Sequence, residues 1–454
     1  MTLTLCGIKP QNAQQHQALE LGQAFLNSRD PNRRIFKTTG YAGSGKSTIA
    51  FALAADQVGQ SKRIAFTAPT HKALNVGRKI AASRGLTHID FHTIHSLLGL
   101  SMAKVDGEKR LQSTGTNSTF LYDVVWLDEC SMVGQDLWGF VQASFSAETR
   151  SLHHPTKLML IGDPAQLYPV GEGKSPTFSR KLEGINLTEV VRQQQGSSLL
   201  DFVTQARRAV TRKAENYRPF RPRGISADPK PEGVILTSKK RVLNLACKNL
   251  EKFDRDPDRF RILAWRNAQV DEYNTAIRQY RYGANAPRFV VGERLITRDP
   301  LLAPDKRTIL VQTSTECVVR EIEEAVYGHY KCWQLQVELE GTEEQKQIYA
   351  LHEDDQARFD AETQRLATAA RRSSFLWRLY FEHLETYAQV RPCYALTVHN
   401  SQGSTFTQVA VDGGDIAKRL YSQEGESELK AMREHNRLWY VATSRASKRL
   451  FVVG

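Results

Sequence analysis

Cysteine is scarce in this sequence and is spread too widely to organise a fold. Only six cysteines occur among 454 residues, and no two of them stand in the paired C-x-x-C spacing of a zinc site. Their low density also excludes a disulfide scaffold, so we expect reduced and mostly buried thiols. The six positions are Cys6, Cys130, Cys247, Cys317, Cys332 and Cys393.

Long apolar runs are absent as well. No stretch approaches the roughly 18 consecutive apolar residues that a membrane-spanning helix needs. The first residues, MTLTLCGIKPQNAQQHQALELG, lack the basic start and apolar run of a secretory leader. We therefore expect a cytoplasmic protein.

Acidic residues are fewer than basic residues. The chain has 62 Lys and Arg against 49 Asp and Glu, which gives a formal net charge of +13. This excess favours a polyanionic partner such as nucleic acid, although charge alone is a weak signal. The length of 454 residues exceeds what one hydrophobic core usually supports and predicts two to four domains.

One short glycine-rich stretch indicates nucleotide chemistry. GYAGSGKST, residues 40–48, follows the β-prone run RRIFKTT and precedes the helix-like run IAFALAADQ. Its spacing satisfies the phosphate-loop pattern, in which backbone N–H groups cradle phosphates, the lysine reaches the β and γ oxygens and the serine holds Mg²⁺. The candidate nucleotide-binding residues are Gly40, Gly43, Ser44, Gly45, Lys46, Ser47 and Thr48, with Ser47 as a Mg²⁺ ligand.

Acidic and amide side chains follow two later apolar runs. Asp128 and Glu129 end VVWL, where Asp128 would ligate Mg²⁺ and Glu129 would orient or deprotonate the attacking water. Gln166 follows KLMLIG, and its amide can both donate and accept a hydrogen bond to a γ-phosphate or a water. Arg192 and Arg445 are the candidate cations for the developing phosphoryl charge.

The alternation of strand-like and helix-like runs predicts an α/β fold. From residue 10 to about 180, short β-branched runs alternate with helical patterns, as in a parallel sheet wrapped by helices. A second α/β domain is expected from about residue 186. Around residue 287 the pattern changes to strand-rich runs that predict a small β-barrel, followed by two helical segments in 354–388. Asp106-Gly107 predicts a hairpin turn inside the first domain.

The order of these motifs resembles superfamily 1 helicases, and the 5′-to-3′ branch that contains the phage Dda and bacterial RecD enzymes in particular. The resemblance covers nearly the whole chain and rests on an ordered series of segments. These are NAQQHQA, GYAGSGKST, APTHKA, HTIHSLL, LDECSM, GDPAQL, LTEVVRQ, LTVHNSQGSTF and YVATSRA.

The resemblance implies a fold class and domain limits. It implies two RecA-like P-loop NTPase domains, with a β-hairpin pin inserted in the first and an SH3-like β-barrel inserted in the second. We expect the first domain at 1–185 with its hairpin at 100–121, the second at 186–286 and 391–454, and the barrel with its helices at 287–390.

The resemblance also assigns further residues. Gln15 would contact adenine, and Gln402 and Gly403 of the fifth motif would face the nucleotide. The DNA strand would be held by residues of three motifs on the two core domains. These are Pro69, Thr70, His71, Lys72, Thr93, His95, Thr397, His399 and Asn400.

One position departs from the pattern of the family. The fifth motif of this branch usually reads His-Lys-x-Gln-Gly, whereas this chain has His399-Asn400-Ser401-Gln402-Gly403. Asn400 can hydrogen-bond a phosphate or a sugar but releases no counterion. We expect weaker or less salt-sensitive strand binding from that position.

Together these features predict an ATP- and Mg²⁺-dependent DNA helicase that translocates 5′ to 3′ on single-stranded DNA and unwinds duplex. The polarity comes from the resemblance alone. An RNA-directed helicase and an ATP-gated DNA-binding switch remain open alternatives. The expected partners are single-stranded DNA and junctions of single- and double-stranded DNA, with replication or repair proteins beside them. The resemblance implies a monomer in a bacterial or phage-infected cell.

Overall fold

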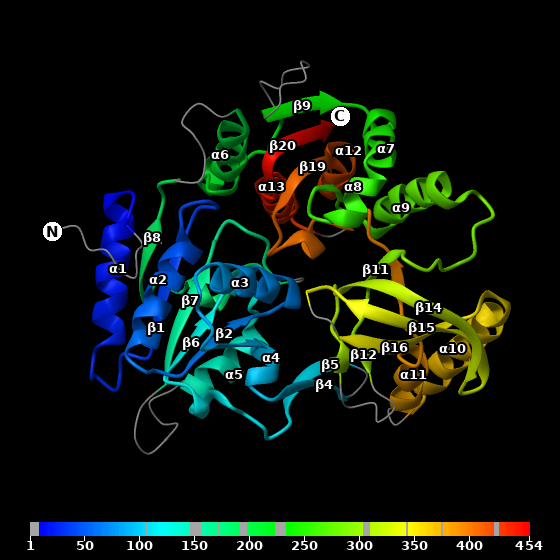
Figure 1. Ribbon diagram of the computed structural model, residues 1–454, viewed down its shortest axis with the longest axis horizontal. Helices are drawn as coiled ribbons and strands as arrows, with labels where there is room; N and C mark the ends of the chain where they lie inside the picture. The colour runs from blue at the N-terminus through cyan, green and yellow to red at the C-terminus, as the bar shows by residue number, and fades with distance from the viewer. Residues whose placement is uncertain are drawn as a thin grey trace.

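The computed structural model contains two large parallel sheets and one large antiparallel sheet among the described residues. It describes residues 9–105, 108–145, 156–169, 172–190, 198–222, 233–302, 309–341, 344–373, 376–421 and 426–454. Figure 1 shows the first parallel sheet with its helices at lower left, a second parallel sheet above it and an antiparallel sheet at lower right. None of the helices in these ranges is both long and apolar enough to cross a membrane.

The first sheet is parallel, and among the described residues it has the order β3-β2-β6-β7-β1-β8. Its inner strands β6 and β7 are buried along their whole length, as expected for a parallel sheet with both faces covered. The strands are β1 (Ile35–Gly40), β2 (Ile64–Ala68), β3 (Ile89–Thr93), β6 (Val124–Leu127), β7 (Lys157–Gly162) and β8 (Glu183–Leu187).

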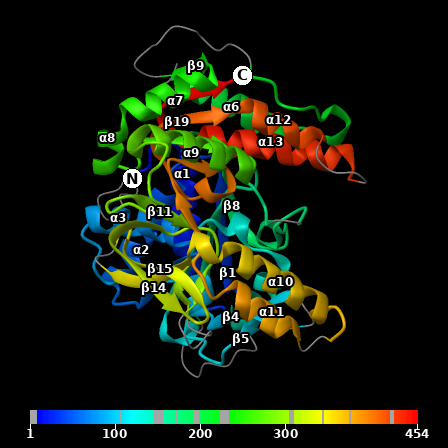
Figure 2. The same ribbon diagram turned by 90° about the vertical axis from the view of Figure 1, so that its right-hand side faces the viewer.

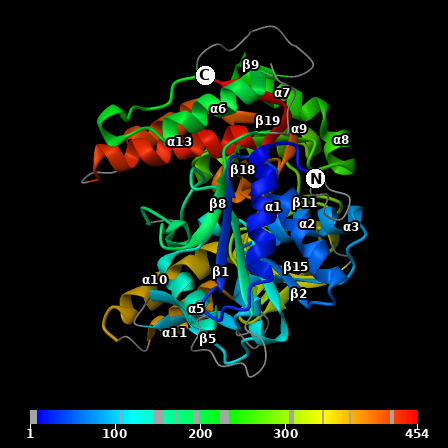
Figure 3. The ribbon, with the colours of Figure 1, turned by 90° about the vertical axis from the view of Figure 1, so that its left-hand side faces the viewer.

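Helices cover both faces of this sheet. On one face, α1 (Ala13–Leu26), α2 (Lys46–Gly59) and α3 (His71–Ser83) share one apolar core with the strands. On the other face, α4 (Ile94–Leu97) and α5 (Gln135–Phe145) form a separate core. Figure 3 shows α1 standing alongside β1 and β8. The sheet is therefore covered on both faces, and its carboxyl edge carries the loops.

A hairpin interrupts the first half at the predicted place. Strands β4 (Leu100–Val105) and β5 (Glu108–Ser113) pair antiparallel from Leu100↔Ser113 to Val105↔Glu108. The predicted turn residues Asp106 and Gly107 lie outside the described residues.

The second sheet is also parallel, with the order β18-β10-β19-β20-β9 among the described strands. Helices α6 and α12 pack against α13, and α7 packs against α9; Figure 2 shows α6, α12 and α13 together at the top. The strands are β9 (Gly233–Thr237), β10 (Phe260–Ala264), β18 (Ala395–Thr397), β19 (Phe406–Asp412) and β20 (Ala446–Val453). The helices are α6 (Ser198–Val210), α7 (Lys239–Lys248), α8 (Leu250–Arg255), α9 (Asn267–Tyr282), α12 (Gly413–Ala417) and α13 (Glu428–Ser444).

The third sheet is antiparallel and is inserted between β10 and β18 in the chain. Its described order is β16-β15-β14-β11-β17, with a separate β12-β13 pair. The strands are β11 (Arg294–Thr297), β12 (Leu301–Leu302), β13 (Ile309–Val311), β14 (Glu316–Tyr327), β15 (Tyr330–Leu339), β16 (Gln345–Leu351) and β17 (Val390–Pro392). Helices α10 (Gln356–Ala370) and α11 (Leu376–Leu384) pack together after β16, where the sequence predicts helices.

The fold class predicted from the sequence is confirmed, because two helix-covered parallel sheets carry a hairpin insertion in the first half and a strand-rich insertion in the second. Two strands extend beyond the domain limits that the sequence predicts. β8 continues to Leu187 and still pairs with β1, and β17 continues to Pro392 within the third sheet.

Candidate active site between the two parallel sheets

The phosphate loop joins β1 to α2 at the carboxyl edge of the first sheet. Two of its glycines show why a side chain would not fit there. A Cβ atom on Gly40 would lie 2.2 Å from the carbonyl oxygen of Leu187, and Gly45 has a left-handed φ of +87° with Gln15 beside it. Because a side chain at either position would clash or strain the backbone, the loop keeps the open shape that exposes N–H groups.

Lys46 begins α2 and folds back over its own loop. Its Nζ donates to the carbonyl oxygens of Gly40 at 3.0 Å and Tyr41 at 2.7 Å. Burial lowers the pKa of Lys46, whereas Asp163 and Glu129 oppose that shift. The lysine therefore lies between the loop and two carboxylates, where an anionic phosphate would compete for it.

Asp128 and Glu129 lie side by side after β6. Asp128 accepts the N–H of Glu129 at 2.8 Å, and Glu129 adopts a left-handed backbone with φ 50°. Burial, followed by the charge of Glu129, raises the pKa of Asp128 to about 7. Burial also raises the pKa of Glu129, against the attraction of Arg445 and Lys46. The cations Lys46 and Arg445 therefore favour the charged forms of this buried pair.

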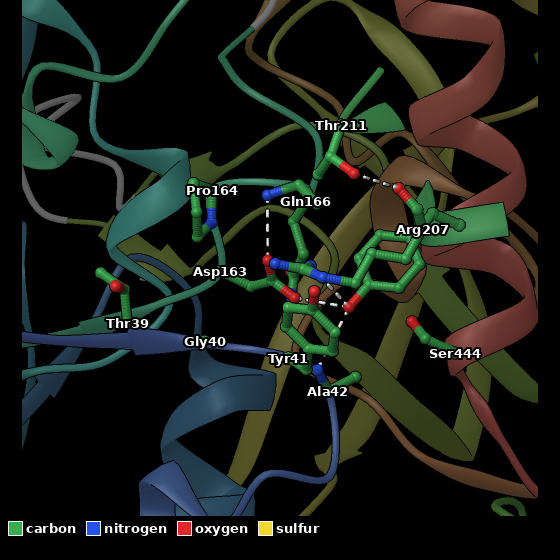
Figure 4. A network of polar contacts seen from close by, with 12 residues as sticks. Thr39, Gly40, Tyr41, Ala42, Asp163, Pro164, Gln166, Arg207, Thr211 and Ser444 are labelled. Atoms are coloured by element: carbon green, nitrogen blue, oxygen red, sulfur yellow. Dashed lines mark hydrogen bonds and ion pairs between the residues drawn. The ribbon is translucent and has the colours of Figure 1, made fainter. Parts of the chain in front are cut away.

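Several buried polar atoms around the loop have no hydrogen-bond partner among the described residues. They are Ser44 Oγ, Glu129 Oε2 and Gln166 Oε1. Figure 4 shows Gln166 beside Asp163, whose carbonyl accepts the N–H of Gln166 at 3.0 Å. Buried polar groups without partners are costly, so these atoms fit a site that is completed by a nucleotide, a cation or water.

The described residues contain no group of three or more His, Cys, Asp or Glu side chains that could hold a metal ion by themselves. Mg²⁺ commonly takes only one or two protein oxygens and completes its shell with phosphates and water. Ser47 and Asp128 fit that role, because both follow the strands whose carboxyl ends form this edge.

Arg445 reaches the site from the second half of the chain. It caps the C-terminus of α13, and it donates from Nη1 to the carbonyl of Ser404 at 3.1 Å and from Nε to that of Val441 at 3.2 Å. Its charge acts on Glu129. The sequence paired Arg445 with Arg192 as cations for the phosphoryl group, but Arg192 lies outside the described residues.

The fifth motif contacts the loop that follows β7. Gln402 donates from Nε2 to the carbonyl of Leu167 at 3.3 Å, and Gly403 packs so closely that a Cβ atom would lie 3.0 Å from the Cβ of Ala73. Both positions therefore lie at the junction of the two parallel sheets.

The side-chain amide of Gln15 is hydrogen-bonded to other residues of the protein. Its Nε2 donates to the carbonyl of Ser44 at 3.0 Å, and its Oε1 accepts the N–H of Gln11 at 2.9 Å. The side chain is 5% exposed. One N–H of this amide is thus bonded to the phosphate loop, which it helps to hold in place.

The residues that sequence reasoning missed form a buried network at this junction (Figure 4). Tyr440 on α13 donates to Asp163 at 2.5 Å and accepts the N–H of Ala42 at 3.1 Å. Arg207 on α6 donates to Asp163 at 2.5 Å and lies 3.8 Å from the ring centre of Tyr41. The available signals were the segments GDPAQL and YVATSRA, which contain Asp163 and Tyr440, and the arginine pair at 207–208 in the helical run 198–210.

The predicted strand-contact residues lie at the ends of strands in both halves. Thr70 and Thr93 cap α3 and α4, by accepting the N–H groups of Ala73 and Ser96. Thr397 accepts the N–H of Asn400 at 3.2 Å. The threonine hydroxyls thus shape these loops.

The three predicted histidines are His71, His95 and His399, and burial lowers the pKa of each. They are therefore neutral near pH 7 and suited to hydrogen bonding rather than to ion pairing. Pro69 and Asn400 are partly exposed beside them.

Lys72 is held within the protein. Its Nζ lies 2.7 Å from Glu316 Oε1 on the third sheet, and its side chain is only 13% exposed. An ammonium group in a buried ion pair is not available to bind a phosphate. In this structure Lys72 is therefore not placed as a strand contact would require.

A cavity of about 660 Å³ opens between the loop after β7 and α13. His399 and Trp265 line it together with the basic residues Arg212, Lys430, Arg433 and Arg437. Arg437 also donates to the carbonyl of Pro164 at 2.9 Å. Tyr168 and Lys174 line the cavity from the first half, so aromatic and basic groups of both halves face one space.

The fold and the site define a P-loop nucleoside triphosphatase with two RecA-like halves. Residues 11–219 match the family model described as AAA domain. The chain is 24% identical over 509 residues to the uncharacterized protein R530 of Acanthamoeba polyphaga mimivirus, covering 94% of this chain and 96% of that protein.

Among solved structures, the chain is similar to Pif1 helicases. One structure, of two coordinating Pif1 helicases at forked dsDNA, has a TM-score of 0.51 at 16% identity and covers 97% of this chain and 91% of that one. Pif1 from Candida albicans has a TM-score of 0.45 at 17% identity, over 98% and 94% of the two chains. The resemblance to superfamily 1 helicases is confirmed at the level of the fold.

Proposed function

We propose that this protein is an ATP-dependent DNA helicase that translocates 5′ to 3′ on single-stranded DNA and unwinds duplex. The observation that carries the proposal is the hydrogen bond between Ala42 of the phosphate loop and Tyr440 of α13, 398 residues apart in the chain. It brings the arginine-bearing end of α13 to the phosphate loop, so nucleotide chemistry and the relative position of the two sheets share one site.

The residues around the loop divide the work of phosphoryl transfer. The N–H groups of the loop and Lys46 would bind the phosphates, and Ser47 and Asp128 would hold Mg²⁺, which would supply positive charge to offset that of the phosphates. Glu129 accepts a proton from the attacking water, and Gln166 positions that water. Arg445, together with Arg192, stabilises the charge that develops on the transferred group.

Two features support a nucleic-acid strand as the polymer that is moved. The net charge of +13 favours a polyanion, and the solved relative with a TM-score of 0.51 is described as acting at forked dsDNA. The strand would pass the carboxyl edges of both sheets, where Pro69, Thr93, His95, His399 and Asn400 lie. Neutral histidines and Asn400 would donate to phosphates or sugars.

The domain limits given by the sequence belong to the same proposal. The first RecA-like domain would span 1–185, the second 186–286 with 391–454, and the strand-rich insertion 287–390. The hairpin β4-β5 would separate the strands, and the protein would act as a monomer on ATP and Mg²⁺.

The experiment that tests this function compares two labelled duplexes, one with a 5′ single-stranded tail and one with a 3′ tail. Lys46→Ala serves as the blank, because it removes the loop cation. Opening of only the 5′-tailed duplex supports the helicase and its polarity. Opening of only the 3′-tailed duplex overturns the polarity, and tail-stimulated ATP hydrolysis without opening of either overturns the unwinding activity.

A further inference from the structure

The hydroxyl group of Tyr440 joins three segments of the chain. It donates to Asp163 Oδ2 at 2.5 Å, accepts the N–H of Ala42 at 3.1 Å and accepts from Arg207 Nη1 at 3.1 Å. One donor and two acceptor sites are all that a phenol offers. The tyrosine is therefore saturated, and any movement of one partner must be followed by the others or break a buried hydrogen bond.

These partners belong to different halves of the protein. Ala42 and Asp163 lie in loops at the carboxyl edge of the first sheet. Arg207 and Tyr440 lie on α6 and α13, which pack together over the second sheet and share its apolar core. The polar network thus crosses the junction that a movement between the halves would have to change.

The network also lies within reach of the phosphates. Ala42 belongs to the phosphate loop, and the charges of Arg207 and Lys46 act on each other. Arg207 Nη1 donates to Asp163 at 2.5 Å, whereas its buried Nε has no hydrogen-bond partner among the described residues. An anion placed against Lys46 would draw Arg207 towards it and away from Asp163.

Both key groups keep the protonation state that the network needs. Burial, followed by the charge of Asp163, raises the pKa of Tyr440, so its hydroxyl stays protonated. Burial alone would lower the pKa of Arg207, but Asp163 and Tyr440 raise it above its ordinary value. The contacts can therefore respond to a bound phosphate without any change in protonation.

We propose that Tyr440 and Arg207 are positioning residues that transmit the nucleotide state of the phosphate loop to α6 and α13 of the second half. Phosphate binding reorients the loop amides, the Ala42–Tyr440 hydrogen bond changes, and the two helices shift as one body with the tyrosine. This inference rests on the proposed function only in requiring that nucleotide binds at residues 40–48.

The test is amide hydrogen exchange of the full chain with Mg²⁺ and either ADP or a non-hydrolysable ATP analogue, without DNA. The wild-type protein should show protection of residues 40–48 and a nucleotide-dependent difference in exchange over α6 and α13. Tyr440→Phe, which removes only the hydroxyl, should keep the loop protection but lose most of the nucleotide-dependent difference in exchange over the two helices.

Tyr273→Phe is the matched control. Tyr273 donates a buried hydrogen bond to Asp412 at 2.9 Å, inside the second half and away from the phosphate loop. This variant loses the same kind of tyrosine–carboxylate bond and should exchange like the wild type. Equal loss of the helix signal in both tyrosine variants would mean general loosening and would overturn the proposal.

Two further outcomes are decisive, and a second variant covers a failure to fold. A Tyr440→Phe protein that transmits the signal in full overturns the proposal. Should that variant not fold, as judged by circular dichroism, Arg207→Lys is scored by the same criteria, since lysine keeps the charge but not the planar set of donors. Absence of loop protection in the wild type overturns the proposed function, because no nucleotide would bind there, and removes the signal that the network is proposed to carry.

Discussion

The ammonium group of Lys72 lies 2.7 Å from Glu316 Oε1, and the guanidinium of Arg261 lies 2.5 Å from the other carboxylate oxygen. Lys72 belongs to α3 of the first half, Arg261 to β10 of the second sheet, and Glu316 to β14 of the third. One fully buried carboxylate therefore connects all three parts of the protein.

Removing Lys72 should destabilise the protein more than it weakens strand binding. Lys72→Met leaves Glu316 paired with Arg261 alone, so the loss should be smaller than the cost of about 3–5 kcal/mol for a buried charge that keeps no partner. We expect a lower midpoint in chemical denaturation and an unchanged salt dependence of single-stranded DNA affinity. Lys79→Met on the exposed side of the same helix is the control. A reduced salt slope at unchanged stability would instead identify Lys72 as a phosphate contact.

The same carboxylate should make stability sensitive to acid. Burial alone would raise the pKa of Glu316, but Arg261 and Lys72 lower it to about 2 from an ordinary value of 4.5. Since the folded-state pKa is depressed, its contribution is complete above about pH 4.5 and is lost as the pH falls towards 2. The difference corresponds to about 3 kcal/mol. Denaturation at several pH values measures it, and Glu316→Gln should remove this part of the pH dependence.

Gln15 offers a test of how the nucleotide is recognised. Because its amide donates to the carbonyl of Ser44 at 3.0 Å, Gln15→Ala should loosen the phosphate loop whatever the base is. One lost hydrogen bond of about 1 kcal/mol predicts a loss of about fivefold in affinity for ATP and GTP alike, measured by calorimetry. The exposed Gln17→Ala is the control. A loss confined to ATP would show that Gln15 contacts adenine directly.

Arg445 should be needed for turnover and not for strand binding. Arg445→Ala removes a cation that acts on Glu129 from the second half. Hydrolysis stimulated by single-stranded DNA should fall about 10³-fold or more, the magnitude known for arginines of this kind. Affinity for the strand, measured by fluorescence anisotropy, should stay the same. Lys448→Ala, exposed three residues further on, is the control, and normal turnover in Arg445→Ala would contradict a site between the two halves.

Much of the fold could be predicted from the sequence because its signals are local. Apolar runs such as VVWL and KLMLIG become buried strands, and GYAGSGKST becomes the turn between a strand and a helix. Asp128, Glu129 and Gln166 follow their strands as predicted, since parallel strands end at one edge. Helix and hairpin ends differ by a few residues, because pairing partners and not composition decide where a strand stops.

The contacts that side chains make across the junction of the two halves could not be predicted from local sequence signals. The sequence predicts a strand contact for both Lys72 and Asn400, yet of the two only Lys72 meets a buried carboxylate, that of Glu316, 244 residues later in the chain. Gln15, for which the resemblance implies an adenine contact, likewise donates a hydrogen bond to Ser44 of the phosphate loop. Such outcomes depend on which elements pack together.

The sequence by itself determined the phosphate loop, the acidic strand end, the two-sheet α/β class and the positive charge, because each depends on neighbouring residues or on composition. Only the tertiary structure decided that Tyr440 and Arg207 meet Asp163 and Ala42, and that Glu316 joins three parts of the protein. The physical reason is that a buried polar group must find a partner where the packed chain provides one, and that position is set by all of the sheets and helices together.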